Sequence, residues 1–437
     1  MLKSSQVIFF TIFLFFFSGS LASQDPYFPP TGSSEWETLS PESMGYCQER
    51  IDSLYNFLDE RSTKAFLLLK DGKIILEHYT GTFTADSSWY WASAGKTLTA
   101  FNIGMAQDQG FLSIEDNTSQ HLGAGWTSCA SEEESLILIR DQLSMTSGLD
   151  DGVPNVDCSL PECLVCLATP GTRWAYHNGP YTLLDAVMEG ATGQNLNLFL
   201  YFNLSVPTGI SGLYVQVENN NVFFSKPRAM ARFGILMQNN GIWNGNTLLG
   251  DPDFLYDMTH PSQELNQAYG YLTWLNGQNQ FLLPGSQFPF QGSLMPDAPD
   301  DMYAALGKNG QMLNVVPSTG MIMVRMGNEP GSQYLVSTLF NNEIWQYINA
   351  LECEPNGLAE IEQSELKLIP TSNSDEWLIQ GLSGQNFKLQ IFDTLGRLLV
   401  HRRKDNRINL SGSAPGIYIL NIESEAGRQY DLRLMKY

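Results

Sequence analysis

The amino-acid sequence predicts an α+β fold followed by a small all-β sandwich. Three observations carry this prediction: strand patterns lie at both ends of the first part of the chain, helical pieces and loops lie between them, and short strands alone follow near the C-terminus. Strands at both ends with helices between them indicate one antiparallel sheet, closed by distant segments, with a helical insertion. At 437 residues the chain is also too long for one ordinary core, so two or three folded units are expected.

A helix and a hairpin open the predicted sheet. Residues 50–61 have apolar side chains at helical spacing, which is typical of a helix that packs on a core. Two apolar runs, 65–69 and 74–79, flank Asp71-Gly72. That dipeptide favours the backbone of a tight turn, so the two runs are expected to pair as adjacent strands.

The remaining elements of the first unit follow in order. The apolar run at 97–105 predicts a buried helix, and residues 230–239 predict a surface helix. Strand patterns return at 302–305, 312–316 and 321–326, and a Pro-Ser-Thr-Gly turn joins the last two. These late strands are expected to complete the sheet that the hairpin opens.

After the first unit the chain becomes polar and then rich in strand patterns. Residues 387–392 alternate between apolar and polar, 395–397 form a predicted turn, and 416–420 form a further strand. Such a run of short strands is typical of a small sandwich. We therefore expect a linker at 354–365 and the second unit at 366–437.

The N-terminus has the features of a signal peptide. Lys3 supplies a positive charge, residues 7–17 form an apolar run, and residues 20–22 offer small side chains for cleavage. The apolar run is too short to span a bilayer. We therefore expect a signal peptide at 1–22, the first folded unit at 23–353, and an exported protein.

Net charge and cysteine content indicate the partners and the compartment. A formal charge of −22 argues against nucleic acid or an anionic membrane as a partner, because like charges repel. Six cysteines in an exported chain are expected to form disulfides, and their pairing stays open. Cys163 and Cys166 have the spacing of a redox or zinc motif, but neither a second such pair nor a βαβ pattern accompanies them, so we interpret them as part of a loop staple.

Ser93-Ala94-Gly95-Lys96 is the first candidate for chemistry. Residues three apart share one face of a helix, so Ser93 can supply a nucleophile and Lys96 its proton acceptor. The pattern alone is weak, because a serine can simply cap a helix and a second Ser-x-x-Lys occurs at 364–367. Its order relative to two later motifs strengthens it.

Those two motifs complete the pattern of a known superfamily. Tyr176-His177-Asn178 precedes an apolar helix, and Lys308-Asn309-Gly310 precedes a strand. With the first motif they resemble the Ser-x-x-Lys, Tyr-x-Asn and Lys-x-Gly motifs of the serine β-lactamase and penicillin-binding-protein superfamily, in its class C-like form. Residues 110–116 and 139–149 resemble further landmarks, and the similarity covers roughly residues 40–350. The resemblance implies an antiparallel sheet flanked by helices, a helical subdomain, and a site between them.

The resemblance also implies a role for each motif. Ser93 would be acylated and the acyl-enzyme then hydrolysed, and either Lys96 or Tyr176 would take the serine proton. Burial and a second cation, Lys308, are both expected to lower the pKa of Lys96, and nearby lysines are expected to favour the Tyr176 phenolate. Asn178 would bind the substrate amide or hold Lys96.

Substrate binding is implied for the third motif, Lys308-Asn309-Gly310. The backbone N–H groups of Ser93 and Gln311 would hold the oxyanion that forms on the substrate. His177 lies at a variable position of the middle motif, and we leave it out of catalysis. The chemistry calls for neither a metal nor a cofactor.

One departure from the superfamily pattern bears on the substrate. Asn309 stands where β-lactamases usually carry Thr or Ser, whose hydroxyl helps to bind the β-lactam carboxylate. We therefore expect an exported serine hydrolase of an ester or amide, either an esterase or a D-amino-acid peptidase, with a β-lactamase as the alternative. A catalytically inactive protein that binds the cell wall or a partner protein is the alternative of another class.

The tail resembles a known sorting module. Residues 389–397, 408–411 and 415–420 are similar to segments of the C-terminal sorting domain of type IX secretion cargo in Bacteroidetes, over residues 366–437. The resemblance implies export through the periplasm, a secreted or cell-surface location, and the secretion machinery as a partner. A carbohydrate-binding β-module is the structural alternative, but the aromatic residues of the tail do not cluster as a sugar platform would.

Overall fold

The computed structural model describes residues 26–331 and 336–353 of the first part of the chain. In the C-terminal part it describes residues 366–371, 375–380, 387–393, 397–403, 406–414, 416–424 and 429–436. The expected signal peptide, 1–22, and the expected linker, 354–365, lie outside the described residues. The chain separates into two compact units, Met1–Cys353 and Glu354–Tyr437, and each is described by itself.

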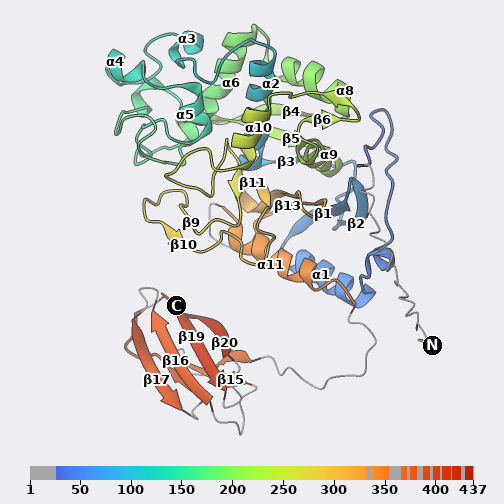
Figure 1. The fold of residues 1–437 in the computed structure, drawn as a ribbon, viewed down its shortest axis with the longest axis vertical. Helices are drawn as coiled ribbons and strands as arrows, with labels where there is room; N and C mark the ends of the chain where they lie inside the picture. Colours follow the sequence, from blue (N-terminus) through green and yellow to red (C-terminus); the bar gives the residue numbers. More distant parts are fainter. Residues whose placement is uncertain are drawn as a thin grey trace, which may run out of the picture. The chain divides into compact units, whose positions relative to one another are not determined.

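The first unit is built on a six-stranded antiparallel sheet, as the predicted α+β fold requires (Figure 1). The predicted hairpin forms two of its strands, and the three late strand patterns form three more. The strands lie in the order β2 (Lys73–Tyr79), β1 (Thr63–Lys70), β13 (Met321–Gly327), β12 (Gln311–Val316), β11 (Tyr303–Gly307) and β8 (Trp274–Leu275). Because β1 pairs directly with β13, segments from the two ends of the unit close the sheet.

Helices cover both faces of this sheet (Figure 1). On one face α1 (Gln48–Glu60), the helix predicted at residues 50–61, packs against α11 (Thr338–Asn349). On the other face α9 (Pro227–Gln238) packs against β1, β12 and β13. The sheet is therefore a buried layer, and β12 and β13 have no exposed residue.

The helix predicted at residues 230–239 forms as α9, but the prediction that it lies on the surface was wrong. Residues 229–237 are all buried, and Arg232 is among them. The guanidinium of Arg232 donates hydrogen bonds to the backbone carbonyls of Pro29, Pro30 and Thr208. These acceptors satisfy the buried cation, so a charged residue in this helix does not mark an exposed face.

The rest of the first unit forms the helical subdomain and its loops. The long helices α2 (Gly95–Asp108) and α6 (Asn178–Thr192) pack against each other, and α2 contains the buried helix predicted at 97–105. The shorter helices are α3 (Ser119–Leu122), α4 (Ser131–Glu134), α5 (Ile139–Leu143), α7 (Leu196–Leu200), α8 (Val206–Thr208) and α10 (Pro252–Thr259). Single helical turns occur at η1 (Pro41–Met44), η2 (Ala92–Ala94), η3 (Pro161–Cys163), η4 (Tyr201–Ser205) and η5 (Lys308–Gly310).

Short strands complete the subdomain and the surface of the first unit. A small sheet has the order β3 (Trp89–Tyr90), β5 (Asn220–Ser225) and β4 (Gly212–Val217). Two separate pairs are β6 (Ile242–Trp243) with β7 (Asn246–Thr247), and β9 (Gln280–Phe281) with β10 (Phe290–Gln291). The small sheet matters most for the site, because β3 leads directly into the Ser93 segment.

All six cysteines form disulfides in the first unit. The pairs are Cys47–Cys353, Cys129–Cys166 and Cys158–Cys163. Cys163 and Cys166 therefore bond to different partners, and their spacing is not that of a redox or zinc pair. Cys158–Cys163 closes a short loop, and Cys47–Cys353 joins the start of α1 to the end of the unit.

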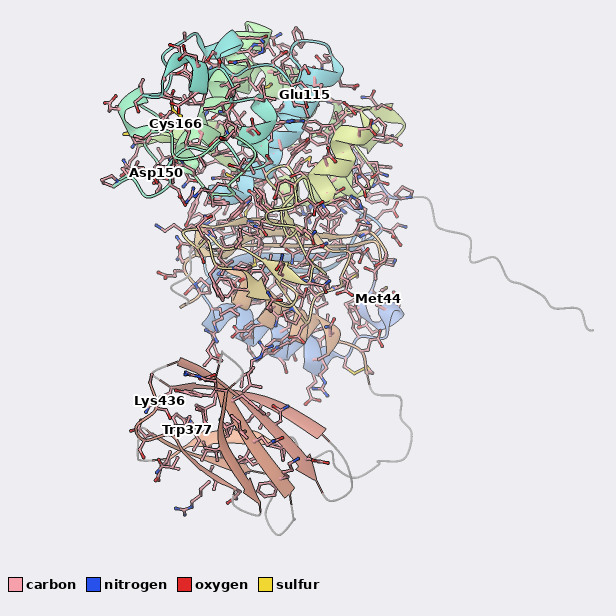
Figure 2. All side chains as sticks on the ribbon, turned by 60° about the vertical axis from the view of Figure 1, so that its left-hand side comes forward. Met44, Glu115, Asp150, Cys166, Trp377 and Lys436 are labelled. Atoms are coloured by element: carbon pink, nitrogen blue, oxygen red, sulfur yellow. A yellow bond between two sulfur atoms is a disulfide. The ribbon has the colours of Figure 1, made fainter. Side chains whose placement is uncertain are left out.

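The second unit contains two antiparallel sheets, consistent with the predicted sandwich. One sheet has the order β14 (Lys367–Pro370), β15 (Glu376–Gln380) and β18 (Arg407–Asn409). The other has the order β17 (Leu398–Arg403), β16 (Phe387–Asp393), β19 (Gly416–Ser424) and β20 (Gln429–Lys436). Trp377, Ile379, Leu389 and Leu420 belong to the core of this unit, and Trp377 is labelled in Figure 2.

The turn predicted at residues 395–397 lies largely outside the described residues. Among the residues that the structure does describe, no helix has the length and apolar character needed to cross a bilayer.

Candidate active site

Ser93 lies in a single helical turn between β3 and α2. The preceding Trp91 fixes this turn, because its indole Nε1 donates to Ser225 Oγ at 2.7 Å and its backbone N–H donates to Phe223 O at 2.8 Å. Ala92 then adopts a φ of 48°, a left-handed conformation that alanine rarely takes. Such strain persists only where the surroundings enforce it, and here it presents Ser93 at the start of α2.

Lys96 lies in the first turn of α2 and contacts Ser93. Its Nζ donates a hydrogen bond to Ser93 Oγ at 3.2 Å, so the predicted shared face of the helix is present. The ammonium nitrogen also lies 3.9 Å from the centroid of the Tyr181 ring and 5.2 Å from that of Tyr176. Lys96 is only 3% exposed, which is rare for a lysine.

Burial lowers the pKa of Lys96 to about 7. Two carboxylates, Asp157 and Asp185, act in the opposite direction and raise it. Lys308 is not among the charges that act on Lys96, and its own side chain is exposed. The expectation that a second cation depresses the Lys96 pKa was therefore wrong, because burial alone produces the shift.

Tyr176 lies against Lys96 and Ser93 within a cluster of aromatic rings. Its ring stacks on Trp274 at 5.8 Å and meets Tyr269 edge-on at 6.2 Å. Burial raises the pKa of Tyr176, and a hydrogen bond with the Ser93 side chain only partly offsets this. The expectation that nearby lysines favour its phenolate was wrong, since the low-dielectric surroundings favour the neutral hydroxyl.

Asn178 begins α6 beside these groups. Its amide Nδ2 donates to Asp157 Oδ1 at 2.7 Å, while its buried Oδ1 has no hydrogen-bond partner among the described residues. His177 is 1% exposed, and both of its ring nitrogens lack a partner within that same set. Burial lowers the pKa of His177, so it is a neutral side chain at neutral pH.

Lys308, Asn309 and Gly310 form the tight turn between β11 and β12. Asn309 and Gly310 have φ values of 64° and 72°, a left-handed backbone that Asn and Gly tolerate best. The Asn309 amide donates to the Tyr90 hydroxyl at 2.7 Å, which ties the turn to β3. Among the described contacts, none joins the Lys308 ammonium to Ser93, Lys96 or Tyr176.

Arg325 holds this turn from inside the sheet. The residue is fully buried, and its guanidinium donates to Asn309 O at 2.6 Å and to Gly310 O at 3.0 Å. It also donates to the carbonyls of Arg61 and Asn328 and to Thr63 Oγ1. A Cβ on Gly310 would lie 2.8 Å from its Nη1, so only glycine fits there.

The end of β11 and the start of β12 both pack against the nucleophile segment. A Cβ on Gly307 would lie 2.3 Å from Trp91 O and 2.9 Å from Ala94 N. Gln311 lies across from Gly307 on β12, the strand that pairs with both β11 and β13. Its buried side chain bonds to the backbone of Gly327 on β13, so it holds β12 and β13 together.

The structure adds three residues that the sequence motifs did not indicate: Asp157, Asp185 and Arg325. Each acts through the motif residues, since the first two interact electrostatically with Lys96 and the third holds Asn309 and Gly310. The available signals were a carboxylate one helical turn after Tyr181 and an arginine inside the apolar run 321–327. Neither pattern specifies a partner until the fold is known.

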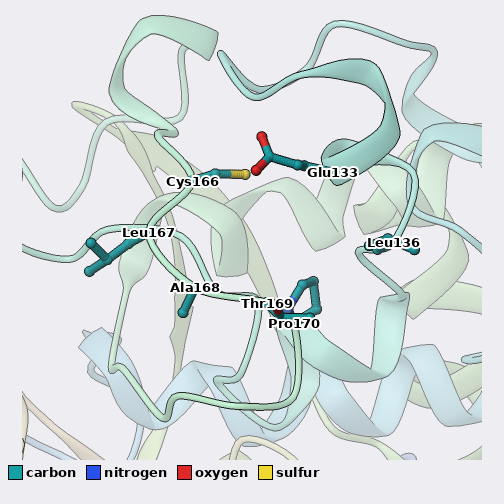
Figure 3. A pocket seen from close by; sticks show the side chains of 7 residues that line it. All are labelled: Glu133, Leu136, Cys166, Leu167, Ala168, Thr169 and Pro170. Carbon is teal, nitrogen blue, oxygen red and sulfur yellow. The ribbon is translucent and has the colours of Figure 1, made fainter.

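A separate surface pocket lies beside the Cys129–Cys166 disulfide (Figure 3). Its volume is about 320 Å³. It is lined by Glu133, Leu136, Cys166, Leu167, Ala168, Thr169 and Pro170. None of these residues belongs to the three motifs, so this pocket is not the candidate active site.

Comparisons with known proteins agree with this architecture. The β-lactamase family profile matches residues 56–339, and the secretion system C-terminal sorting domain matches residues 369–435. No curated protein matches the chain.

Similar solved structures share the fold at low sequence identity. One is described as a candidate 6-aminohexanoate-dimer hydrolase from Bacillus anthracis (TM-score 0.55, 17% identity, 75% of this chain and 90% of that one). Another is described as a candidate β-lactamase from Bacteroides dorei (TM-score 0.55, 18% identity, 70% of this chain and 99% of that one). A third is a penicillin-binding-protein homologue from Caulobacter crescentus (TM-score 0.51, 12% identity, 70% of this chain and 98% of that one).

Each of the two family matches falls in one of the two units. The tail is a type IX secretion sorting domain, which assigns the protein a secreted or cell-surface location and an interaction with the secretion machinery. The β-lactamase match lies within the first unit. The chain belongs to the β-lactamase family of hydrolases and carries a type IX C-terminal sorting domain.

Proposed function

We propose that the protein is an exported serine hydrolase that cleaves an ester or amide of a small acyl group through an acyl-enzyme at Ser93. One observation carries this proposal: Lys96 Nζ lies 3.2 Å from Ser93 Oγ. Burial lowers the pKa of that lysine to about 7. A neutral amine at this distance is positioned to accept the serine proton, and a hydroxyl needs such a base to attack a carbonyl.

We assign the role of base to Lys96 and that of proton donor to Tyr176. As Ser93 Oγ attacks, its proton passes to Lys96 Nζ, a bond forms from Oγ to the carbonyl carbon, and the π electrons move to the carbonyl oxygen. Tyr176, kept neutral by burial, then donates its proton to the leaving group and recovers one from Lys96. Water hydrolyses the acyl-enzyme by the same route in reverse.

We place the second oxyanion donor at the Lys308 backbone N–H, in preference to Gln311. Along β11 alternate residues turn their backbone groups to the same edge, and Met302 O faces the outer edge, where it accepts from Asn276 N at 2.9 Å. Lys308 follows in this alternation, next to the Gly307 that contacts the Ser93 turn. Together with Ser93 N–H it would form a pair of donors, each of which contributes about 10²-fold to 10³-fold in rate.

The test is acylation of Ser93 by defined substrates. The purified protein is incubated with nitrophenyl esters, D-alanyl peptides and a chromogenic cephalosporin, and the adduct is located by mass spectrometry. We expect turnover of an ester or amide and an adduct on Ser93 that S93A abolishes, with S364A, in the second Ser-x-x-Lys, as the matched control. An undiminished adduct in S93A contradicts the assignment.

The same panel separates the alternatives. Preferred hydrolysis of the cephalosporin would assign a β-lactamase instead. Absence of both turnover and adduct would favour an inactive protein that binds the cell wall or a partner.

We also propose the boundaries of the mature chain. Cleavage after the signal peptide at residues 1–22 would leave the hydrolase at 23–353, the linker at 354–365 and the sorting domain at 366–437. N-terminal sequencing and intact mass of the exported protein test these limits.

A further inference from the structure

Asp185 is a buried carboxylate that the mechanism above does not use. It lies in α6 and is 8% exposed. Neither carboxylate oxygen has a hydrogen-bond partner of normal geometry among the described residues. An ionised carboxylate in such a place is costly unless a cation or a donor compensates it.

Lys96 connects to Asp185 through Tyr181: its Nζ lies 3.9 Å from the centroid of the Tyr181 ring, and Asp185 follows Tyr181 by one turn on the same face of α6. The two side chains interact electrostatically across the contact between α6 and α2, and each shifts the pKa of the other. Burial raises the pKa of Asp185 to about 7, and Lys96 acts in the opposite direction. Lys96 and Asp185 therefore both change protonation state near pH 7.

The other groups around Asp185 are polar or anionic. On α6 itself these are Tyr181 and Glu189, and Glu189 further raises the Asp185 pKa. From β4 comes Tyr214, and from β5 comes Asn221, whose side chain lies close enough to lower the pKa. Asp157 and Tyr176 also interact with Lys96. Lys96 is therefore the only cation recorded as acting on Asp185 within the described part of the chain.

We propose that Asp185 is a positioning residue that stabilises the ammonium form of Lys96 while that lysine holds the proton of Ser93. This inference rests on the proposed function. Before attack Lys96 is a neutral amine. When the O–H bond of Ser93 breaks and the proton bonds to Lys96 Nζ, a positive charge appears that the buried Asp185 carboxylate attracts, and this attraction lowers the energy of the acylation transition state.

The sign of the effect follows from the same attraction. A carboxylate favours the protonated lysine and so raises its pKa. Removal of the charge at Asp185 should therefore lower the Lys96 pKa, which keeps the amine neutral at lower pH but makes it a weaker base. The rate of acylation should extend to lower pH while its maximum falls.

The experiment measures the rate of Ser93 labelling by a fluorophosphonate between pH 5 and 9, followed by intact mass. In D185N we expect the acid limb of the profile to move to lower pH and the plateau to fall about tenfold. D185E retains a carboxylate and should return the limb to its wild-type position. Y214F removes a buried hydroxyl that contacts Thr99 in the same layer, without a change in formal charge, and should leave the limb unmoved.

Three outcomes overturn the inference. Superimposable profiles for wild type and D185N, or equal shifts in D185N and Y214F, remove the role of Asp185 and leave Ser93 acylation intact. Absence of labelling in the wild type removes the proposed function and the inference with it. If D185N does not fold, D185S, which leaves room for water, is measured in its place with the same expected direction.

Discussion

Lys96 and Lys308 are the two lysines that the sequence motifs predict for the site, and the structure gives them opposite surroundings. Lys96 is 3% exposed, lies over the Tyr181 ring and contacts Ser93. Lys308 projects from a turn and is exposed. Its backbone, and not its ammonium, adjoins the nucleophile segment through Gly307.

The difference shows that the same residue type serves two purposes in one site. Burial removes the hydration that stabilises an ammonium, which turns Lys96 into a base near neutral pH. An exposed lysine keeps its hydration and can offer only its backbone or a screened charge. Substitutions at Lys96 and its contacts should therefore reduce activity more than substitutions in the Lys308–Gly310 turn, and the following predictions test that ranking.

Replacement of Lys96 should have the largest effect. K96M removes the proton acceptor of Ser93, and we expect kcat/KM to fall about 10³-fold. In the wild type kcat/KM should rise with pH through about 7, because Lys96 must lose its proton to act and burial sets its pKa there. Steady-state kinetics over pH 5 to 9 measure both effects. A K96M enzyme within tenfold of wild type would break the distinction between the two lysines.

Replacement of Tyr176 should cost less than that of Lys96. Y176F removes the donor to the leaving group but keeps the ring that stacks on Trp274, and we expect kcat to fall about tenfold to 10²-fold. The loss should be greatest for poor leaving groups, since nitrophenolate needs little protonation. A comparison of a nitrophenyl ester with an alkyl ester measures this. A larger loss in Y176F than in K96M would make Tyr176 the base.

Replacement of Arg325 tests whether the turn Lys308–Gly310 depends on the buried arginine that holds it. R325K keeps the charge, but one ammonium nitrogen cannot reproduce the five bonds that the three guanidinium nitrogens donate. We expect kcat/KM to fall about tenfold, with the Tm lowered by several degrees, because buried carbonyls lose their donors. Kinetics and thermal unfolding of the same sample check this. Unchanged kinetics in a destabilised protein would show that the turn is not coupled to acylation.

The Lys308 side chain should matter far less than that of Lys96. K308M keeps the backbone N–H and removes only an exposed ammonium, so kcat/KM for a neutral ester should stay within about threefold. The comparison with K96M is direct, since both replace a lysine with methionine. A loss as large as that of K96M would mean that the Lys308 ammonium reaches the bound substrate.

These contrasts also mark what the sequence could predict. Local spacing and motif order were enough to predict that Ser93, Lys96 and Tyr176 share one site, and the structure brings the three together. Asp185 and Arg325 could not be found in this way, because their roles depend on which distant segments bury them. The same reason explains why α9 was expected on the surface: the carbonyls that satisfy its Arg232 lie in remote parts of the chain.

Asn309 should show the smallest effect on activity, and its substitution tests the argument about β-lactams. N309T introduces the residue that β-lactamases usually carry, but Asn309 has a φ of 64°, a conformation that costs a β-branched side chain about 1–2 kcal/mol. The variant also loses the hydrogen bond to Tyr90.

For N309T we expect ester hydrolysis within about twofold of wild type, a Tm lowered by a few degrees, and no cephalosporin hydrolysis. N309G, which accepts this backbone without strain, separates the conformational cost from the lost hydrogen bond. Gain of cephalosporin hydrolysis in N309T would show that one side chain, and not the shape of the turn, excludes β-lactams.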